Sequence, residues 1–158
     1  MWYAHSTSVI KPTNLLLFLV EQGSAWVDLS KATKLKEVVL RCRIPHPLWV
    51  ISVLRTITPN HRNLQWVSIQ GPYIGHDPDS PTNRADLANI RQAIVMGESI
   101  YMQWLELDRL LVELWETHTI HLEVLYYEYP DGMGRHCVGS VLPEVTKRGI
   151  ADLVKLEA

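Results

Sequence analysis

The chain contains little cysteine: only Cys42 and Cys137 occur in 158 residues. Two thiols cannot build the disulfide framework that stabilises small secreted domains, and neither lies in a C-x-x-C motif. We therefore expect both thiols to be reduced. This predicts an intracellular protein of the cytoplasm or the nucleus.

A long apolar run and a strong charge of one sign are also missing. The longest apolar run, LLLFLV at residues 15–20, is too short to cross a membrane. The formal net charge is −2, and the 15 Lys and Arg residues are scattered along the chain. These features predict no membrane association and no binding to nucleic acid, which would require a basic patch.

The length and composition fit one globular domain that spans residues 1–158. Hydrophobic residues make up 47% of the chain, enough to build a core. Residues 1–11 follow no periodic pattern and are the candidate for a disordered segment.

Two stretches, KLKEVVLRC at residues 34–42 and NLQWVSIQG at residues 63–71, match at a constant offset of 29 residues. The matched apolar positions are Leu35 with Leu64, Val38 with Val67, and Leu40 with Ile69. Alternating apolar residues predict a strand in each stretch. An offset of 29 lies at the upper edge of the leucine-rich-repeat range of roughly 20–29 residues.

A third strand is expected at residues 119–129, where two registers compete. A doubled period would favour Leu122, Leu125 and Tyr127 as inward positions. Polar His121 and Glu123 instead indicate that the residues between and around them face inward, namely Ile120, Leu122, Val124 and Tyr126. We favour the second register, because burying Glu123 without a partner would cost on the order of several kcal/mol.

Helical patterns precede the first strand, at residues 12–23, and separate the strands, at residues 47–57, 84–96 and 99–116; a closing helix is expected at 142–156. The strongest has an apolar stripe, for which we favour a core role over docking of a partner helix: Ile100, Trp104, Leu107, Leu111 and Leu114. Alternating strands and helices predict an α/β fold, an irregular leucine-rich-repeat-like array of parallel strands.

Several segments resemble fungal proteins of the F-box/leucine-rich-repeat-like group. They are AWVDLSKATKLKEVVLRC, ITPNHRNLQWVSI, IRQAI, YMQWLELDRLLVELWETHTI and LPEVTKRGIADLV, within residues 25–154. No F-box pattern precedes residue 15. The resemblance implies the repeat-like part of such a protein, acting as a recognition surface and bringing no catalytic residues.

Metal ligands are present only in weak patterns. His118 and His121 with His136 and Cys137 could supply four zinc ligands, but their spacing is not that of a zinc ribbon. The acidic loop HDPDS at residues 76–80 lacks the regular series of an EF-hand. We expect neither a metal nor another cofactor.

Two functions from different classes remain. The first is a non-catalytic protein-binding surface on the outward positions of the strands: Glu37, Arg41, Trp66, Ser68, Gln70, His121 and Glu123, with Val39 and Leu125 between them. The alternative is a small α/β enzyme with a pocket at the carboxyl ends of the strands, near the 72–83 loop: His76, Asp77, Cys42 and Tyr127. We favour protein binding, because no catalytic constellation stands out.

The sheet edges suggest one more interaction. Only residues 137–142, read as a short fourth strand, are available to cover the edge beyond the third strand, and little precedes the first strand. An open edge presents unpaired backbone groups and would allow a homodimer, with Trp26 and Val39 near the contact.

Overall fold

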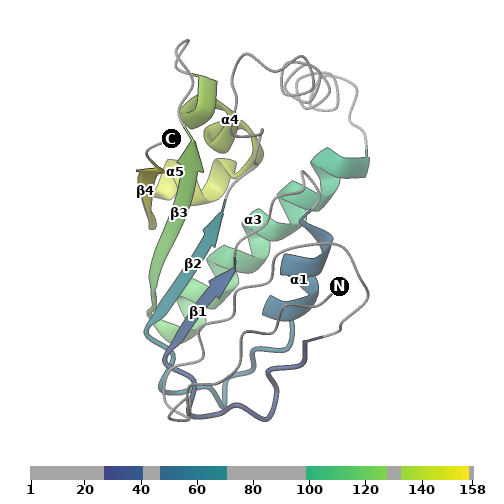
Figure 1. Ribbon diagram of the computed structural model, residues 1–158, viewed down its shortest axis with the longest axis vertical. Helices are drawn as coiled ribbons and strands as arrows, with labels where there is room; N and C mark the ends of the chain where they lie inside the picture. The colour runs from purple at the N-terminus through teal and green to yellow at the C-terminus, as the bar shows by residue number, and fades with distance from the viewer. Residues whose placement is uncertain (1–26, 41–46, 71–98, 128–132, 157–158) are drawn as a thin grey trace.

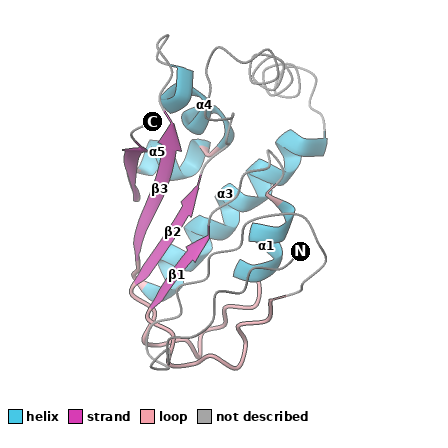
Figure 2. Ribbon diagram, in the orientation of Figure 1, coloured by secondary structure: helices cyan, strands magenta, loops and turns pink. Residues whose placement is uncertain are grey.

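The computed structural model describes residues 27–40, 47–70, 99–127 and 133–156, which form a parallel sheet with helices. Its strands lie in the order β1 (Glu37–Leu40), β2 (Trp66–Gln70), β3 (His121–Tyr127) and β4 (Ala151–Leu156) (Figures 1 and 2). Along the chain they alternate with helices α1 (Leu48–Leu54), α3 (Ser99–His118), α4 (Met133–Val141) and α5 (Pro143–Arg148). The expected α/β class with parallel strands is confirmed.

The 29-residue offset is present in the register of the sheet. Val38 pairs with Val67, and Leu40 pairs with Ile69. The same offset recurs at the other end of the sheet, where Leu122 pairs with Ala151. Between β2 and β3 the offset is 55 residues, as in the pair Trp66 and His121. The strands therefore repeat at equal spacing on either side of one long insertion.

The turns before β1 and β2 repeat in the same way. The backbone N–H of Ala32 donates to the carbonyl of Leu29, and 29 residues later the backbone N–H of His61 donates to the carbonyl of Thr58. The N–H groups of Leu35 and Leu64 then donate to the carbonyls of Ala32 and His61 in turn. Matched hydrogen bonds show that the similarity extends from the sequence to the backbone.

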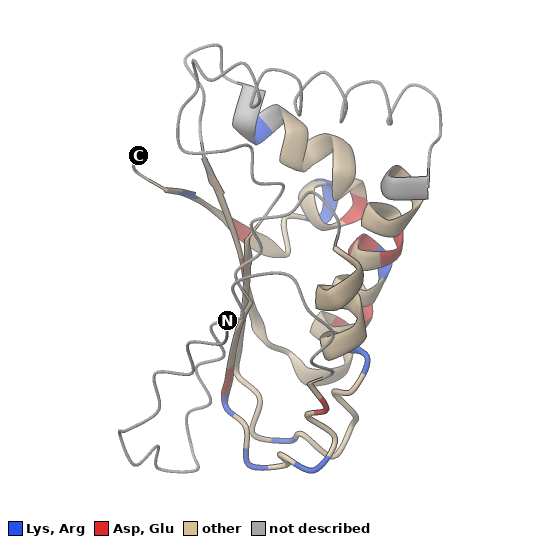
Figure 3. Ribbon diagram, turned by 45° about the vertical axis from the view of Figure 1, so that its right-hand side comes forward, with Lys and Arg blue, Asp and Glu red and all other residues tan. Residues whose placement is uncertain are grey.

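The helices in the described ranges all lie on one side of the sheet (Figure 3). The strand positions on that side are almost fully buried: Val38, Leu40, Val67, Ile69, Leu122 and Val124. Ile120, Leu122, Val124 and Tyr126 all belong to the core, so the register favoured for the third strand is confirmed. Each fully buried aliphatic side chain contributes about 1.5–3 kcal/mol relative to an exposed one.

The apolar stripe of α3 belongs to this core. Trp104, Leu107, Leu111 and Leu114 are buried in the cluster that also contains the sheet residues. The side chain of Ile100 lies outside the described residues. The expectation that the stripe is core rather than a docking site for a partner helix is confirmed for these four residues.

Two predicted elements are wrong near the C-terminus. Residues 137–142 do not form a strand; most of them belong to α4, because Val138, Val141 and Leu142 have helical spacing and are all buried. The closing helix expected at 142–156 ends at Arg148, and Gly149 caps it in the left-handed conformation with φ of 61°. The chain then continues as strand β4, which pairs with β3.

This correction changes which strand ends the sheet. In the described ranges the two edge strands are β1 and β4. A homodimer through an open edge stays a prediction, with β4 in place of residues 137–142 at the second edge. Trp26 lies outside the described residues, as do residues 1–11, the expected helices at 12–23 and 84–96, and the 72–83 loop.

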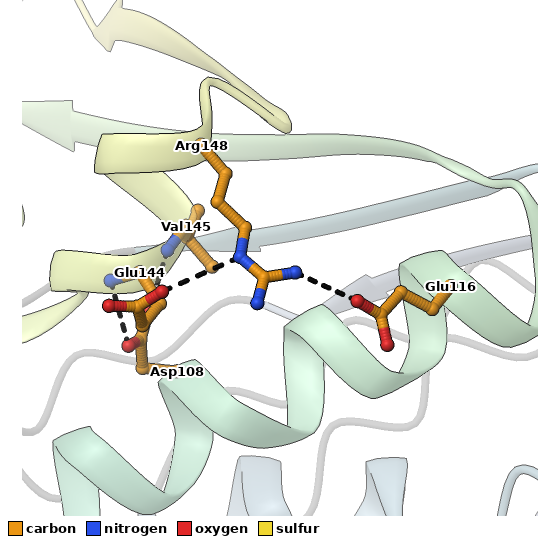
Figure 4. Close-up of polar contacts among 5 residues, drawn as sticks. All are labelled: Asp108, Glu116, Glu144, Val145 and Arg148. Carbon is orange, nitrogen blue, oxygen red and sulfur yellow. Dashed lines mark hydrogen bonds and ion pairs between the residues drawn. The ribbon is translucent and has the colours of Figure 1, made fainter.

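A buried carboxylate joins α3 to α5 (Figure 4). Asp108 on α3 accepts hydrogen bonds from the backbone N–H groups of Glu144 at 3.0 Å and Val145 at 2.9 Å. These are orphan donors in the first turn of α5, whose own N-cap residue, Leu142, provides no side-chain cap. Asp108 therefore caps a helix that begins 35 residues further along the chain.

An ion-pair network lies beside this cap. The guanidinium of Arg148 on α5 contacts Glu116 of α3 at 2.8 Å and Glu144 at 3.4 Å (Figure 4). Glu116 and then Glu144 raise the pKa of Arg148, so this side chain stays charged. Because all three side chains are about half exposed, we expect the pairs to contribute little to stability individually.

Candidate functional site

The sheet has a second face, which points away from the helices and which we call the outer face. Side chains alternate along a strand, so the residues between the core positions belong to it. Apart from Tyr127, whose side chain is not described, its members in the described ranges are Glu37, Val39, Trp66, Ser68, Gln70, His121, Glu123, Leu125, Asp152, Val154 and Leu156. The predicted binding residues therefore share one face, except for Arg41, which lies outside the described residues.

One row of the outer face crosses three strands at their amino ends. Glu37 pairs with Trp66, and Trp66 pairs with His121. The rings of Trp66 and His121 are in contact, with centroids 4.2 Å apart and planes tilted by 43°. Trp66 is nevertheless 37% exposed. The row therefore presents part of a large aromatic ring to solvent, held by a neighbouring imidazole.

Carboxylates border this aromatic pair. The Nε2 atom of His121 lies 3.3 Å from a carboxylate oxygen of Asp152 on β4. In the next row the hydroxyl of Ser68 donates to Glu123 at 2.5 Å. With Glu37 on the β1 side, three carboxylates belong to the part of the outer face around Trp66 and His121.

The exposed part of the predicted surface is smaller than expected. Ser68 is 1% exposed and Gln70 is 8% exposed, although both lie on the outer face. Glu37, Trp66, His121 and Glu123 keep exposed surface. The binding residues available to a partner are therefore gathered at the amino ends of the strands.

Asp152 is a site residue that the sequence analysis missed. Residues 142–156 were expected to be helical, and a helix would not place Asp152 beside His121. The strand signal was weak, because Asp152 separates the apolar Ala151 and Leu153 but the apolar Val154 then interrupts the alternation. In the structure Asp152 pairs with Glu123 in the sheet register and belongs to the outer face.

Of the histidines considered as zinc ligands, His118 and His121 do not come together. The imidazole of His121 contacts Trp66 on the outer face, whereas His118 ends α3 and lies close to His61. Cys137 is buried in α4, and the side chain of His136 lies outside the described residues. Within the described ranges, no group of three or more His, Cys, Asp or Glu side chains is arranged to hold a metal ion.

His61 has a structural role that the sequence analysis did not assign. Its side chain is fully buried, and Nε2 donates to the carbonyl of Leu29 at 2.9 Å. Its Nδ1 accepts the backbone N–H of Thr58 at 3.0 Å. The imidazole thus connects the turn before β1 to the turn before β2. The 29-residue alignment places Ala32 at the matching position, so the matching turn before β1 has no such imidazole.

We expect His118 to make folding sensitive to mild acid. Burial, followed by the nearby His61, lowers the pKa of His118 below 6.5, although a hydrogen bond with the His61 backbone opposes this. The unfolded chain then binds the proton more readily, so stability is full above about pH 6.5 and falls as the pH drops through the folded-state pKa. His118→Gln should lose less stability in that range.

Urea unfolding at pH 8.5, 7.5 and 5.5 measures this effect. Between pH 8.5 and 7.5 the difference between wild type and His118→Gln should stay constant, since His118 does not titrate there in either state. Equal losses for both proteins between pH 7.5 and 5.5 would show that His118 has no part in the acid sensitivity.

The residues of the alternative enzyme site cannot be placed together. His76, Asp77 and Cys42 lie outside the described residues, and of Tyr127 only the backbone position in β3 is described. No helix within the described ranges is both long enough and apolar enough to cross a membrane. Comparison with protein-family models, with curated proteins and with solved structures finds no match to this chain.

Proposed function

We propose that the chain is a non-catalytic protein-binding module that recognises its partner with the outer face of the sheet. The observation that carries this proposal is the exposed ring of Trp66, fixed against His121 in the middle of a cross-strand row. Tryptophan is enriched among residues that dominate binding energy at interfaces. The resemblance to the repeat-like part of fungal F-box proteins points to the same role.

The geometry suits recognition for a physical reason. Trp66 begins a strand that is hydrogen-bonded on both sides, to β1 and to β3, so its backbone is held rigidly. Contact with the His121 ring restricts the side chain further. A partner would therefore meet an aromatic surface that is already ordered, and binding would cost little side-chain entropy.

The equal 29-residue offsets support a leucine-rich-repeat-like array. In repeat proteins of this kind each strand adds one row to a continuous surface. Here helices cover one face of the sheet, and on the other face the outward residues of neighbouring strands align and are exposed at the amino ends of the strands. This arrangement supports assigning recognition to the outer face rather than to the helices.

Peptide display on the full-length chain tests the proposal. Peptides selected against the wild type should bind Trp66→Ala at least about tenfold more weakly, a loss of about 1.4 kcal/mol. Met102→Ala is the matched control, because Met102 is another exposed large apolar residue, 54% exposed, on helix α3. Its affinity for the same peptides should equal that of the wild type, as measured by calorimetry.

Two outcomes would contradict this proposal. One is that repeated selections yield no peptide that binds the folded chain. The other is that Trp66→Ala and Met102→Ala bind the selected peptides equally well, which would place recognition outside the outer face. Circular dichroism of each variant establishes that the substituted chain is folded.

A further inference from the structure

We propose that the outer face recognises a basic side chain, lysine or arginine, presented by a protein segment over the ring of Trp66. This inference rests on the proposed function, because it specifies the chemistry of the partner at the same surface. Two independent features carry it: the sign of the charges on the outer face and the exposed aromatic ring among them.

Within the described ranges, the Asp, Glu, Lys and Arg residues of the outer face are of one sign; Arg41 lies outside those ranges. Glu37, Glu123 and Asp152 are carboxylates on three different strands, β1, β3 and β4. In the described ranges no lysine or arginine occupies an outward position of any strand. The chain as a whole has a formal net charge of only −2, so this distribution is local rather than a consequence of composition.

The internal contacts of these carboxylates leave Glu37 as the main candidate to pair with a partner. Glu123 already accepts a hydrogen bond from Ser68, and Asp152 contacts His121. Glu37 lies directly beside Trp66 in the sheet register and keeps part of its surface exposed. A cation that lies over the Trp66 ring would therefore also be close to a carboxylate.

The aromatic ring adds an attraction that a carboxylate alone does not supply. A lysine or arginine over the face of tryptophan is attracted by the negative face of the ring. Contact with His121 leaves Trp66 partly exposed, so part of the ring remains accessible. An aromatic ring flanked by carboxylates favours a cation, whereas an acidic segment or a phosphate would meet like charges.

The basic residues near the site restrict how the partner can approach. Lys34, Lys36 and Arg62 are exposed in the segments that precede β1 and β2, beyond the amino ends of the strands. A basic side chain entering past the strand ends would be repelled by them. We therefore place its approach across the face of the sheet, over Trp66.

Calorimetry with the display-selected peptides tests the inference. We expect each peptide that depends on Trp66 to contain lysine or arginine, and its counterpart with glutamine at those positions to bind at least about tenfold more weakly. Glu37→Gln should lower the affinity for the basic peptide severalfold and leave the affinity for its glutamine counterpart unchanged. Raising the salt concentration from about 0.05 to 0.5 M should reduce the preference for the basic peptide.

The outcomes separate this inference from the proposed function. The inference of a basic partner would be wrong if the Trp66-dependent peptides contained no basic residue, or if neither Glu37→Gln nor salt changed their affinity. Either result would leave the proposal of protein binding intact. A failure to obtain any Trp66-dependent peptide would overturn both. Met102 lies on α3 and not on a strand of the outer face. The Met102→Ala variant should therefore show the wild-type preference for the basic peptide.

Discussion

Replacing Leu107 by alanine is expected to lower the free energy of unfolding by about 2–5 kcal/mol. Leu107 is 1% exposed and lies in the middle of the apolar stripe of α3, between Trp104 and Leu111. Its side chain belongs to the same cluster as the core positions of the sheet. Alanine would leave a cavity that neighbours on a helix and on strands fill only in part, because both are held by backbone hydrogen bonds.

Urea unfolding followed by circular dichroism measures this loss. Met102→Ala, on the exposed side of the same helix, is the control and should change stability by no more than about 0.5 kcal/mol. If Leu107→Ala also lost less than about 0.5 kcal/mol, the stripe would not be packed as described, and a role in docking a partner helix would return.

The sheet could be predicted from sequence where inward apolar positions recur at every second residue. Val38 and Leu40 match Val67 and Ile69 at the 29-residue offset, and the structure pairs them. In the third strand Glu123 fixed the register, because a charged residue cannot be buried without a partner at small cost. Periodicity and the cost of burying charge are local properties, so a single sequence reveals them.

The C-terminal part could not be predicted in the same way because two periods follow each other within a few residues. Leu142 and Val145 have helical spacing, and both are buried. After Gly149 the chain is a strand in which Ala151 and Leu153 pack against the core, but Val154 interrupts the alternation of apolar and polar residues. Read together, these residues resemble one long amphipathic helix. Gly149 separates the helix from the strand, but glycine is also common inside loops. It was therefore a weak signal of a boundary.

The sequence predicted which face of the sheet these residues share, but not how much of that face is exposed. Alternation placed Glu37, Trp66, His121 and Glu123 on the outer face, and the structure agrees. Burial of Ser68 on that same face depends on tertiary surroundings, which alternation does not encode. The exposed row at the strand ends therefore emerged only from the three-dimensional arrangement.

Asp108→Ala is expected to lower the free energy of unfolding by roughly 1–3 kcal/mol at neutral pH. The substitution would leave the N–H groups of Glu144 and Val145 without their acceptor in the first turn of α5. Part of that loss is offset, because the variant no longer buries a charged carboxylate. Asp108→Asn should lose less than alanine, since its amide oxygen can still accept one of the two hydrogen bonds.

The pH dependence shows which of these opposing effects dominates at Asp108. Burial raises the pKa of the Asp108 carboxyl above 3.8, against the lowering effect of the two backbone donors. A raised folded-state pKa means that the carboxyl's contribution to stability is full below about pH 3.8 and is lost as the pH rises through the folded-state value. Wild type should therefore gain stability relative to Asp108→Asn as the pH is lowered from 7 towards 4. Chemical unfolding of both proteins across this range measures the difference. If wild type instead lost stability relative to Asp108→Asn as the pH was lowered, the helix-capping hydrogen bonds would outweigh the cost of burying the charge.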